Sequence, residues 1–442
     1  MSTSSAARER INALLDENSF VEIGALVSAR ATDFNLKQID TPSDGCITGY
    51  GVINDSLVYV YAQDASVLNG SIGEMHAKKI CNLYDMAMKM GAPVIGLIDS
   101  CGLRLQEATD ALNAMGELFM KQTLASGVVP QISAVFGNCG GGLAFVPGLS
   151  DFTFMEAEKA KLFVNAPNTL DGNSTEKCDT ASAKFQFEEG GTVDFIGSES
   201  EIFTQIRELV SFLPANNEEE AEYVECNDDL NRASSAIGAC YKDAKLAFTD
   251  IADDYNFIEV KAGYAKNMVC GFIKLNGSTI GCVGNRSVIY DEEGKEAEKV
   301  NDKITAMACD KAAEFINFCD AFSIPVLSLT NITGFCTCPC SVKRIAKAGA
   351  KLTYAFANAT VAKVNIIAEK ALGSAYITMN SKAIGADVTF AFEGAEVGAM
   401  DANAAAKIMY AGESSDVISE KAKEYAALQN SSLSAAKRGS PR

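Results

Sequence analysis

Histidine and basic residues are scarce in this sequence, and tryptophan is absent. The single histidine among the 442 residues is His76, so a serine–histidine–aspartate triad elsewhere in the chain is excluded. Lysine and arginine total 38 against 57 aspartates and glutamates, which gives a net charge of −19. This balance argues against nucleic acid or an anionic membrane as the main partner. Because the protein is negatively charged overall, a binding site for an anionic substrate would need basic side chains around it.

Long apolar runs and an N-terminal signal core are also missing. No run approaches the length of a membrane-spanning helix, and residues 1–8 are polar. The 14 cysteines are scattered along the chain. Without a signal peptide they indicate reduced thiols and not a disulfide framework. We therefore expect a cytoplasmic protein.

The hydrophobic pattern predicts an α/β fold. The expected helices cover residues 6–17, 74–90, 107–125 and 200–213, and the expected strands cover 20–23, 94–99 and 128–135, with a hairpin over 49–61. Buried strands that alternate with helices indicate parallel pairing through right-handed crossovers.

The second half of the chain repeats the pattern of the first. The strand-like stretch 257–260 follows its counterpart 20–23 by 237 positions, and Pro325 follows Pro93 by 232. Offsets this similar indicate that a whole α/β domain has been duplicated, with a period too long for a solenoid.

An acidic, polar segment lies between the two copies. Residues 215–222 contain four glutamates and no strong periodicity, which is typical of a linker. The predicted domains are therefore residues 1–222 and 223–442.

A glycine-rich turn, Gly140-Gly141-Gly142, follows the predicted strand 128–135. Glycines leave no side chain in the way of a ligand, so backbone N–H groups at a strand-to-helix turn can point at it. Such amides can stabilise a carbonyl oxygen that becomes negative during a reaction. Taken alone, this stretch would also fit an ordinary packing turn.

A second turn, Gly373-Ser374-Ala375, occupies the equivalent place in the second copy. Ser374 lies 49 residues after Pro325, and Gly141 lies 48 residues after Pro93. Two equivalent turns predict two oxyanion sites.

Carboxyl transfer is a reaction that would need two such sites. A thioester that loses its α-proton becomes an enolate, and a biotin urea oxygen gains negative charge as carbon dioxide leaves. Each amide donor to such an anion contributes about 3 kcal/mol. Biotin's ring nitrogen can take the proton, so no protein base is required. The nearest acid after the first turn is Asp151, which disfavours simple hydration chemistry.

Several motifs together resemble the carboxyltransferase (β) subunits of biotin-dependent acyl-CoA carboxylases, of the propionyl-CoA and methylcrotonyl-CoA type. The resemblance covers almost the whole chain. The motifs of the first half lie at residues 7–11, 63–64, 70–74, 98–107 and 137–142, and those of the second half lie at Pro325, 334–335, 348–352, 373–376 and 385–387.

The resemblance implies two tandem crotonase-like domains (the ClpP/crotonase β-β-α superhelix), with the N-terminal domain on the acyl-CoA side and the C-terminal domain on the biotin side. Gly141 and Gly142 would hold the thioester oxygen, and the amides of Ser374 and Ala375 would hold the biotin urea oxygen. The family also implies a hexamer (a trimer of dimers or equivalent), with active sites between the N-domain of one subunit and the C-domain of another.

Further substrate-binding residues are expected around the turns. They are Arg104, Gly140, Gly373, Tyr376 and Ile377. Arg104 and the pair Lys78-Lys79 are candidates for the phosphates and adenine of CoA, although the lysines also fit a solvated surface. Propionyl-CoA members tend to carry aspartate where Ile377 lies, so the acyl group is not fixed.

No metal site is expected. Cys336, Cys338 and Cys340 alternate without the paired spacing of zinc ligands, which favours a reduced-thiol loop. Lys89 lies in a biotinylation-like Ala-Met-Lys-Met stretch, but a helix end is the better interpretation. The biotin must then arrive on a separate carrier chain.

Three functions stay open. The first is carboxylation of a small acyl-CoA, with a biotin carrier protein and a biotin carboxylase subunit as partners. The second is the same half-reaction in a sodium-translocating decarboxylase of the methylmalonyl-CoA or glutaconyl-CoA type, with a membrane decarboxylase subunit as partner. The third, suggested by Ser374 and the altered cysteine loop, is a non-catalytic CoA-binding scaffold.

Overall fold

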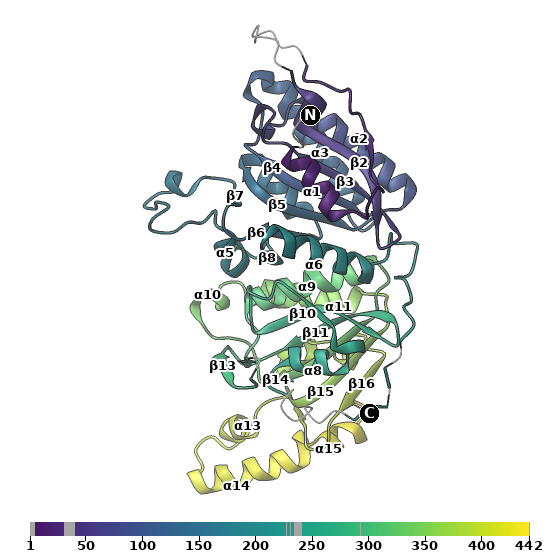
Figure 1. Ribbon diagram of the computed structural model, residues 1–442. Helices are drawn as coiled ribbons and strands as arrows, with labels where there is room; N and C mark the ends of the chain where they lie inside the picture. The colour runs from purple at the N-terminus through teal and green to yellow at the C-terminus, as the bar shows by residue number, and fades with distance from the viewer. Residues whose placement is uncertain are drawn as a thin grey trace. The chain divides into compact units, whose positions relative to one another are not determined.

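The computed structural model describes residues 5–30, 40–226, 228–229, 231–233, 241–291 and 293–441. The chain divides into two compact units, residues 1–222 and 223–442, and each is described by itself (Figure 1). Both units are mixed α/β structures.

Unit 1 is built on an eight-stranded sheet with the order β1-β2-β3-β4-β5-β6-β8, and β7 also pairs with β5. The strands are β1 (Val21–Ile23), β2 (Cys46–Ile53), β3 (Ser56–Gln63), β4 (Val94–Ser100), β5 (Gln131–Gly140), β6 (Phe152–Glu156), β7 (Lys161–Phe163) and β8 (Phe195–Gly197). β1, β2 and β3 pair antiparallel, and the strands from β3 onwards pair parallel. The parallel part is the crossover topology that the sequence predicts.

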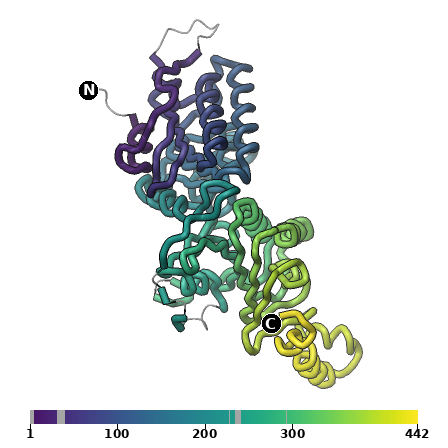
Figure 2. The backbone as a smooth tube through the Cα atoms, turned by 90° about the vertical axis from the view of Figure 1, so that its right-hand side faces the viewer, coloured from purple at the N-terminus to yellow at the C-terminus, as the bar shows by residue number. Residues whose placement is uncertain are grey.

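The helices of unit 1 lie on both faces of this sheet. They are α1 (Ala6–Leu14), α2 (Glu74–Met90), α3 (Ala108–Ala125), α4 (Phe145–Leu149), α5 (Ala183–Phe185) and α6 (Glu199–Phe212). α2 and α3 run next to each other (Figure 2). The first helix is shorter than the predicted 6–17, because the chain becomes extended at Leu15 and the N–H of Asp16 bonds to the carbonyl of Val52.

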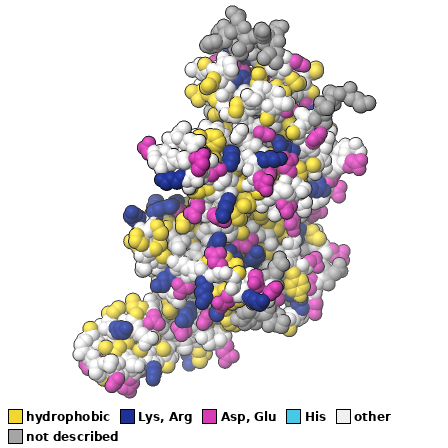
Figure 3. All heavy atoms as spheres, turned by 60° about the vertical axis from the view of Figure 1, so that its left-hand side comes forward, with side chains coloured by type: hydrophobic (Ala, Val, Ile, Leu, Met, Phe, Trp, Pro, Cys, Tyr) yellow, Lys and Arg dark blue, Asp and Glu magenta, His cyan; other side chains and the backbone are white. Residues whose placement is uncertain are grey.

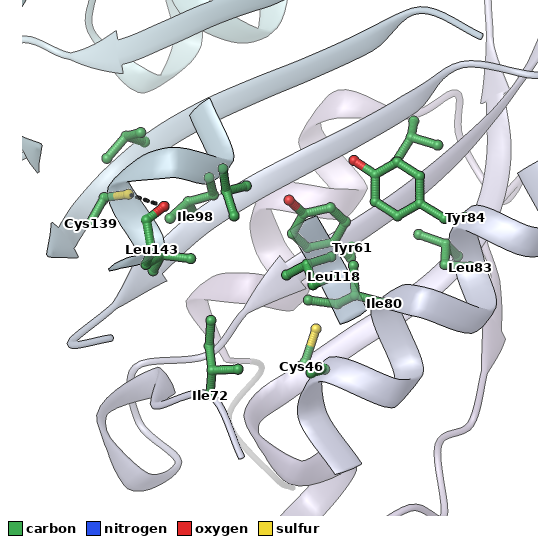
Figure 4. Packing of buried hydrophobic residues seen from close by; sticks show 14 of the residues in the cluster. Cys46, Tyr61, Ile72, Ile80, Leu83, Tyr84, Ile98, Leu118, Cys139 and Leu143 are labelled. Carbon is green, nitrogen blue, oxygen red and sulfur yellow. Dashed lines mark hydrogen bonds between the residues drawn. The ribbon is translucent and has the colours of Figure 1, made fainter. Parts of the chain in front are cut away.

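A core between the sheet and α2 and α3 holds the parallel strands in place. Tyr61 and Tyr84 lie in it with Ile80 and Leu118 (Figure 4). These side chains are at most 2% exposed. Burying an apolar side chain of this size contributes about 2 kcal/mol, so this layer fixes the position of β4 and β5, whose C-terminal ends carry the candidate site.

Unit 2 repeats this arrangement in a seven-stranded sheet with the order β16-β15-β14-β11-β10-β9, and β17 also pairs with β15. The strands are β9 (Phe257–Val260), β10 (Met268–Leu275), β11 (Ser278–Asn285), β14 (Val326–Ile332), β15 (Lys363–Leu372), β16 (Val388–Ala391) and β17 (Glu396–Gly398), while β12 (Val288–Tyr290) and β13 (Glu296–Lys299) form a separate ribbon. The helices are α8 (Ala244–Ile251), α9 (Ala306–Ala321), α10 (Pro339–Val342), α11 (Ile345–Asn358), α12 (Gly373–Thr378), α13 (Ala402–Met409), α14 (Ser415–Tyr425) and α15 (Ser432–Lys437).

The two central strands begin and end at positions that differ by one constant offset. β14 and β15 start and stop 232 residues after β4 and β5. Read from β1 to β6 and from β9 to β16, the two sheets have the same strand order, and the sheet of unit 1 continues to β8. This is the duplication that the spacing of Pro93 and Pro325 predicts.

Buried lysines provide a second marker of the duplication. In unit 1 the Nζ of Lys79 donates to the carbonyls of Ser43 and Cys46, at 3.1 and 2.5 Å. In unit 2 the Nζ of Lys311, 232 positions later, donates to the carbonyls of Lys261, Tyr264 and Met268, the first residue of β10, at 2.7 to 3.0 Å. Burial lowers the pKa of Lys79, and it lowers that of Lys311 to about 8. Each lysine ties the helix of one crossover to the loop before the central hairpin.

Candidate active site

The first glycine turn starts where β5 ends, and a short helical turn over residues 141–144 leads into α4. Gly141 has a φ of +65°, a left-handed conformation that side chains rarely adopt. A Cβ at Gly141 would meet nothing within 4 Å, and Gly142 is exposed, so the turn is open on one side. The thiol of Cys139, before the turn, donates to the carbonyl of Leu143, after it, at 3.6 Å (Figure 4).

The second turn has the same geometry at the same offset. Gly373 follows β15 with a φ of +66°, Ser374 is exposed, and Ala375 is buried. The first turn has the same sequence of burial, because Gly142 is exposed and Leu143 is buried. Both turns open a short helix, and the first N–H groups of a helix have no acceptor within it.

The equivalence of the turns shifts the expected residue pairs by one. Gly142 corresponds to Ser374, and Leu143 corresponds to Ala375. The pair expected in the first turn, Gly141 and Gly142, is therefore equivalent to Gly373 and Ser374. The pair expected in the second turn, Ser374 and Ala375, lies one residue later. Only Gly142 and Ser374 are both equivalent to each other and expected to bind. Of the two flanking residues, Tyr376 is buried and Ile377 is 43% exposed on α12.

A loop after β4 lies against the first turn. A Cβ at Gly102 would be 2.9 Å from the carbonyl oxygen of Gly140, so only glycine allows this approach. Ile72 holds the loop on its other side, because its N–H donates to Gly102 and its carbonyl accepts from the N–H of Arg104.

Arg104 anchors this loop from within the protein. Its Nη1 donates to Asp44 Oδ1 at 2.7 Å and to Glu107 Oε1 at 2.8 Å, and its Nη2 and Nε donate to the backbone and hydroxyl of Ser71. The guanidinium is 4% exposed. The second oxygen of Glu107 accepts from the N–H of Glu74 at the start of α2.

These contacts engage two of the residues that were expected to bind CoA. Arg104 is enclosed by Asp44, Glu107 and Ser71 and positions the loop, and its expected role in binding CoA phosphates stays a prediction. Lys79 is buried and donates to backbone carbonyls, so it does not belong to the solvated surface that was its alternative. Lys78 is exposed and pairs with Glu74, which matches the solvated surface alternative.

Asp44 and the single histidine complete the buried cluster. The ring of His76 contacts Asp44 O through Nδ1 at 3.0 Å and Gln63 Nε2 through Nε2 at 3.2 Å. Burial, with the charge of Arg104, lowers the pKa of His76 to about 3. The histidine is therefore a neutral structural residue. The sequence motifs contain Ser71 and Glu107, but nothing in the sequence marks Asp44, which lies in a turn with a φ of +49°.

A thiol cluster takes the corresponding place in unit 2. Ile304 bonds to Gly334 and to Cys336 as Ile72 bonds to Gly102 and to Arg104, again 232 positions later. Cys336 is thus the counterpart of Arg104. The carboxamide of Asn301 lies 3.0 Å from its sulfur, and Cys338 and Cys340 follow it in the loop.

Charge and hydropathy add two observations about the described residues. On the face shown in Figure 3, basic and acidic side chains alternate over both units. In the part of the chain that the structure describes, no helix combines the length and the apolar character needed to cross a membrane.

Comparison with known proteins adds independent findings. The model of the carboxyl transferase domain family matches residues 3–439. The chain is 38% identical to the methylmalonyl-CoA decarboxylase subunit alpha of Propionigenium modestum, over 91% of this chain and 78% of that protein. It is also 38% identical to the propionyl-CoA carboxylase beta chain of Roseobacter denitrificans, over 93% and 81% of the two chains.

A solved structure extends the similarity to the fold. Transcarboxylase 12S, described as a hexamer assembly with hydrolysed methylmalonyl-coenzyme A bound, matches with a TM-score of 0.92 and 34% identity. The match covers 98% of this chain and 85% of that one.

Proposed function

Because the chain belongs to the carboxyl transferase domain family, we propose that it moves a carboxyl group between carrier-bound biotin and the α-carbon of a small acyl-CoA. The protein is a biotin-dependent carboxyltransferase of the acyl-CoA carboxylase and decarboxylase type. The two-carbonyl mechanism, the substrate and the assembly belong to the proposal.

The observation that carries the mechanism is the pair of turns with one backbone conformation. Gly141 and Gly373 differ by 1° in φ, and the residues after them are exposed in both copies. Fixed N–H dipoles at such a turn stabilise an oxygen that gains charge in the transition state, and each donor contributes about 3 kcal/mol. Two turns support two charged oxygens.

The first turn is proposed to receive the thioester oxygen on the backbone amides of Gly141 and Gly142, with Gly140 allowing close approach. The second is proposed to receive the urea oxygen of biotin on the amides of Ser374 and Ala375, beside Gly373. Bound biotin supplies the carboxyl group and a ring nitrogen that can take the α-proton. The chain's own part is to orient both carbonyls and to stabilise negative charge, without a protein base.

In this proposal each unit is a crotonase-like domain, with residues 1–222 on the acyl-CoA side and residues 223–442 on the biotin side. Tyr376 and Ile377 would lie near the reacting groups. The names of the similar proteins, propionyl-CoA carboxylase and methylmalonyl-CoA decarboxylase, support a short acyl chain.

A homo-hexamer is proposed for the assembly, since the similar transcarboxylase 12S forms one. An apolar stripe on α3 supports a protein interface, because Leu112, Met120 and Leu124 are each more than half exposed. Such patches on a surface mark interaction sites. A biotin carrier protein and a biotin carboxylase subunit are the proposed further partners.

Carboxyl exchange between free biotin and malonyl-CoA or methylmalonyl-CoA tests the activity. We expect exchange in the wild type and a fall of about 100-fold or more in Gly142→Val, because a Cβ there would lie 3.1 Å from the Sδ of Met115 and the added side chain would move the N–H groups of the turn away from the substrate oxygen. If neither malonyl-CoA nor methylmalonyl-CoA exchanged its carboxyl group with biotin, the proposal would be refuted.

Gly148→Val is the control for a valine at a nearby exposed glycine, since a Cβ at this position of α4 meets nothing within 4 Å, whereas one at Gly142 lies 3.1 Å from Met115. Its exchange rate should stay close to that of the wild type. Ser374→Val separates the two sides. It should raise the KM for free biotin more than that for the acyl-CoA, and the reverse split would exchange the roles of the two units.

A decarboxylase of the sodium-translocating type is the second candidate, and 38% identity to a methylmalonyl-CoA decarboxylase subunit alpha favours it. The same active site would serve carboxylation and decarboxylation of the acyl-CoA. The identity of the partner subunit therefore distinguishes the two candidate functions. Co-purification with a membrane decarboxylase subunit would support this candidate, and co-purification with a biotin carboxylase would oppose it. A non-catalytic scaffold would bind CoA without exchange, and Gly142→Val would then change no rate.

A further inference from the structure

The loop after β14 carries three cysteines where the loop after β4 carries an ionic anchor. Arg104 holds the first loop through Asp44 and Glu107. Its counterpart Cys336 is buried and forms its contacts through sulfur, with the carboxamide of Asn301 at 3.0 Å and the N–H of Cys338 at 3.4 Å. The second loop therefore depends on the chemical state of its thiols.

Two of these thiols lie in contact. The sulfurs of Cys338 and Cys340 are 3.0 Å apart, Cys340 is exposed, and Cys338 is half-buried. A disulfide requires sulfurs about 2.05 Å apart, so these two sulfurs must approach by about 1 Å to bond. Exposed thiols of this kind react readily, whereas buried ones are inert.

The core cysteines provide the contrast. Cys46 and Cys270 are fully buried, and burial raises the pKa of each thiol to about 12. Neither is available as a thiolate near neutral pH.

We propose that Cys338 and Cys340 form a dithiol site that exchanges with low-molecular-weight disulfides such as oxidised glutathione. The thiolate of Cys340 attacks one sulfur of the small disulfide, forms a mixed disulfide and releases one thiolate. The thiolate of Cys338 then attacks the sulfur of Cys340, which closes the protein disulfide and releases the second small thiolate. The two protein thiols are oxidised, the small disulfide is reduced to two thiols, and the two protein protons pass to the leaving thiolates.

Closure of this disulfide would reach the second turn through the backbone. The carbonyl of Cys338, which precedes α10, accepts from the N–H groups of Ser341 and Val342 in the second half of that helix. The hydroxyl of Ser341 accepts from the N–H of Ala306 at the start of α9. β14, which precedes the loop, pairs with β15 next to the turn, with Ile332 opposite Ala371. Oxidation would therefore shift the segment that flanks the second turn.

Peptide mapping tests the site without any assay of activity. The full-length protein is incubated with oxidised glutathione, free thiols are alkylated, and the tryptic peptide 312–343 is analysed. We expect one internal disulfide between Cys338 and Cys340, lighter by two hydrogens and reversed by dithiothreitol. Cys338→Ser and Cys340→Ser should instead accumulate a glutathione adduct on the remaining thiol. Cys178→Ser, at an exposed cysteine of unit 1, is the matched control and should form the disulfide like the wild type.

A peptide that stays reduced, or a disulfide that joins Cys336 or Cys319, would overturn the proposal. The effect on catalysis rests on the proposed carboxyl transfer and is measured separately. Oxidation should slow biotin exchange by about tenfold in the wild type, which corresponds to about 1.4 kcal/mol in the barrier. Cys338→Ser should not respond to oxidised glutathione in this way. An unchanged rate in fully oxidised wild type would overturn the link to the second turn. A complete lack of exchange in the reduced protein would refute the proposed function, while the mapping result would stand.

Discussion

Asp44 joins Arg104 and His76 in one buried cluster of unit 1. It accepts from the guanidinium of Arg104 through its side chain and contacts the imidazole of His76 through its backbone carbonyl. Two formal charges buried without partners would cost several kcal/mol, so the members of such a cluster depend on one another. The sequence indicates a structural role for His76 but does not predict the contact between Arg104 and Asp44, because Asp44 lies 60 positions away in an irregular turn that no periodicity marks.

The histidine should make stability depend on pH. The folded state holds His76 with a pKa of about 3, while the unfolded chain protonates it near pH 6.5. Its contribution is therefore complete at neutral pH and is lost as the pH falls towards 3. We expect the free energy of unfolding to fall by about 2 kcal/mol more in the wild type than in His76→Gln between pH 7 and pH 5.

Urea denaturation of both proteins at several pH values measures this difference. The comparison cancels the titration of carboxylates such as Asp44, whose pKa burial raises. A difference between the two proteins that stays constant with pH would contradict the assignment. The imidazole resonance of this single histidine should likewise not titrate between pH 8 and pH 5.

Among the elements, the strands that carry the turns show where sequence patterns suffice. Alternating apolar runs predict β4 and the first part of β5, and Pro130 explains why β5 begins at Gln131 and not at residue 128. The strand continues through Gly140, beyond the predicted end at residue 135, because Asn138 to Gly140 pair with the three-residue strand β7. A strand this short leaves no clear signal in the sequence.

The left-handed glycines of the two turns should have similar energetic roles. Gly141→Ala and Gly373→Ala meet no steric clash, since the closest atom to either new Cβ is at 3.4 Å. The positive φ alone should lower the stability of each variant by about 1 kcal/mol. Thermal and urea unfolding measure this loss. Gly148→Ala, where φ is not positive, should show no such loss, and an equal loss there would contradict the explanation.

At the scale of the whole molecule, the motifs correctly indicated the family, and the match over residues 3–439 confirms it. The division into residues 1–222 and 223–442 could be placed from the acidic linker and the constant offset. The acyl chain could not be predicted, because it depends on which side chains surround the substrate, and sequence spacing does not determine those contacts.

The apolar stripe on α3 leads to a prediction about assembly. Met120→Glu places a charge among Leu112 and Leu124, so a complex that buries this stripe should dissociate. Light scattering after size exclusion should show a smaller particle than in the wild type. Met90→Glu, at an equally exposed methionine where α2 ends, is the control and should keep the full assembly. A particle of Met120→Glu as large as that of the wild type would exclude the stripe from the interface.

The offset of 232 residues between β4 and β14, and between β5 and β15, gives each position in these strands and in the turns after them an internal reference in the other half. Glycine occupies positions 141 and 373 alike, and both have a left-handed φ that favours glycine. The position equivalent to Gly142 holds a serine, Ser374, and the position equivalent to Arg104 holds a cysteine, Cys336. At these positions the same backbone geometry carries different residues in the two halves. Exchanging residues between the halves would therefore separate what the chain needs in order to fold from what each half needs for its own ligand.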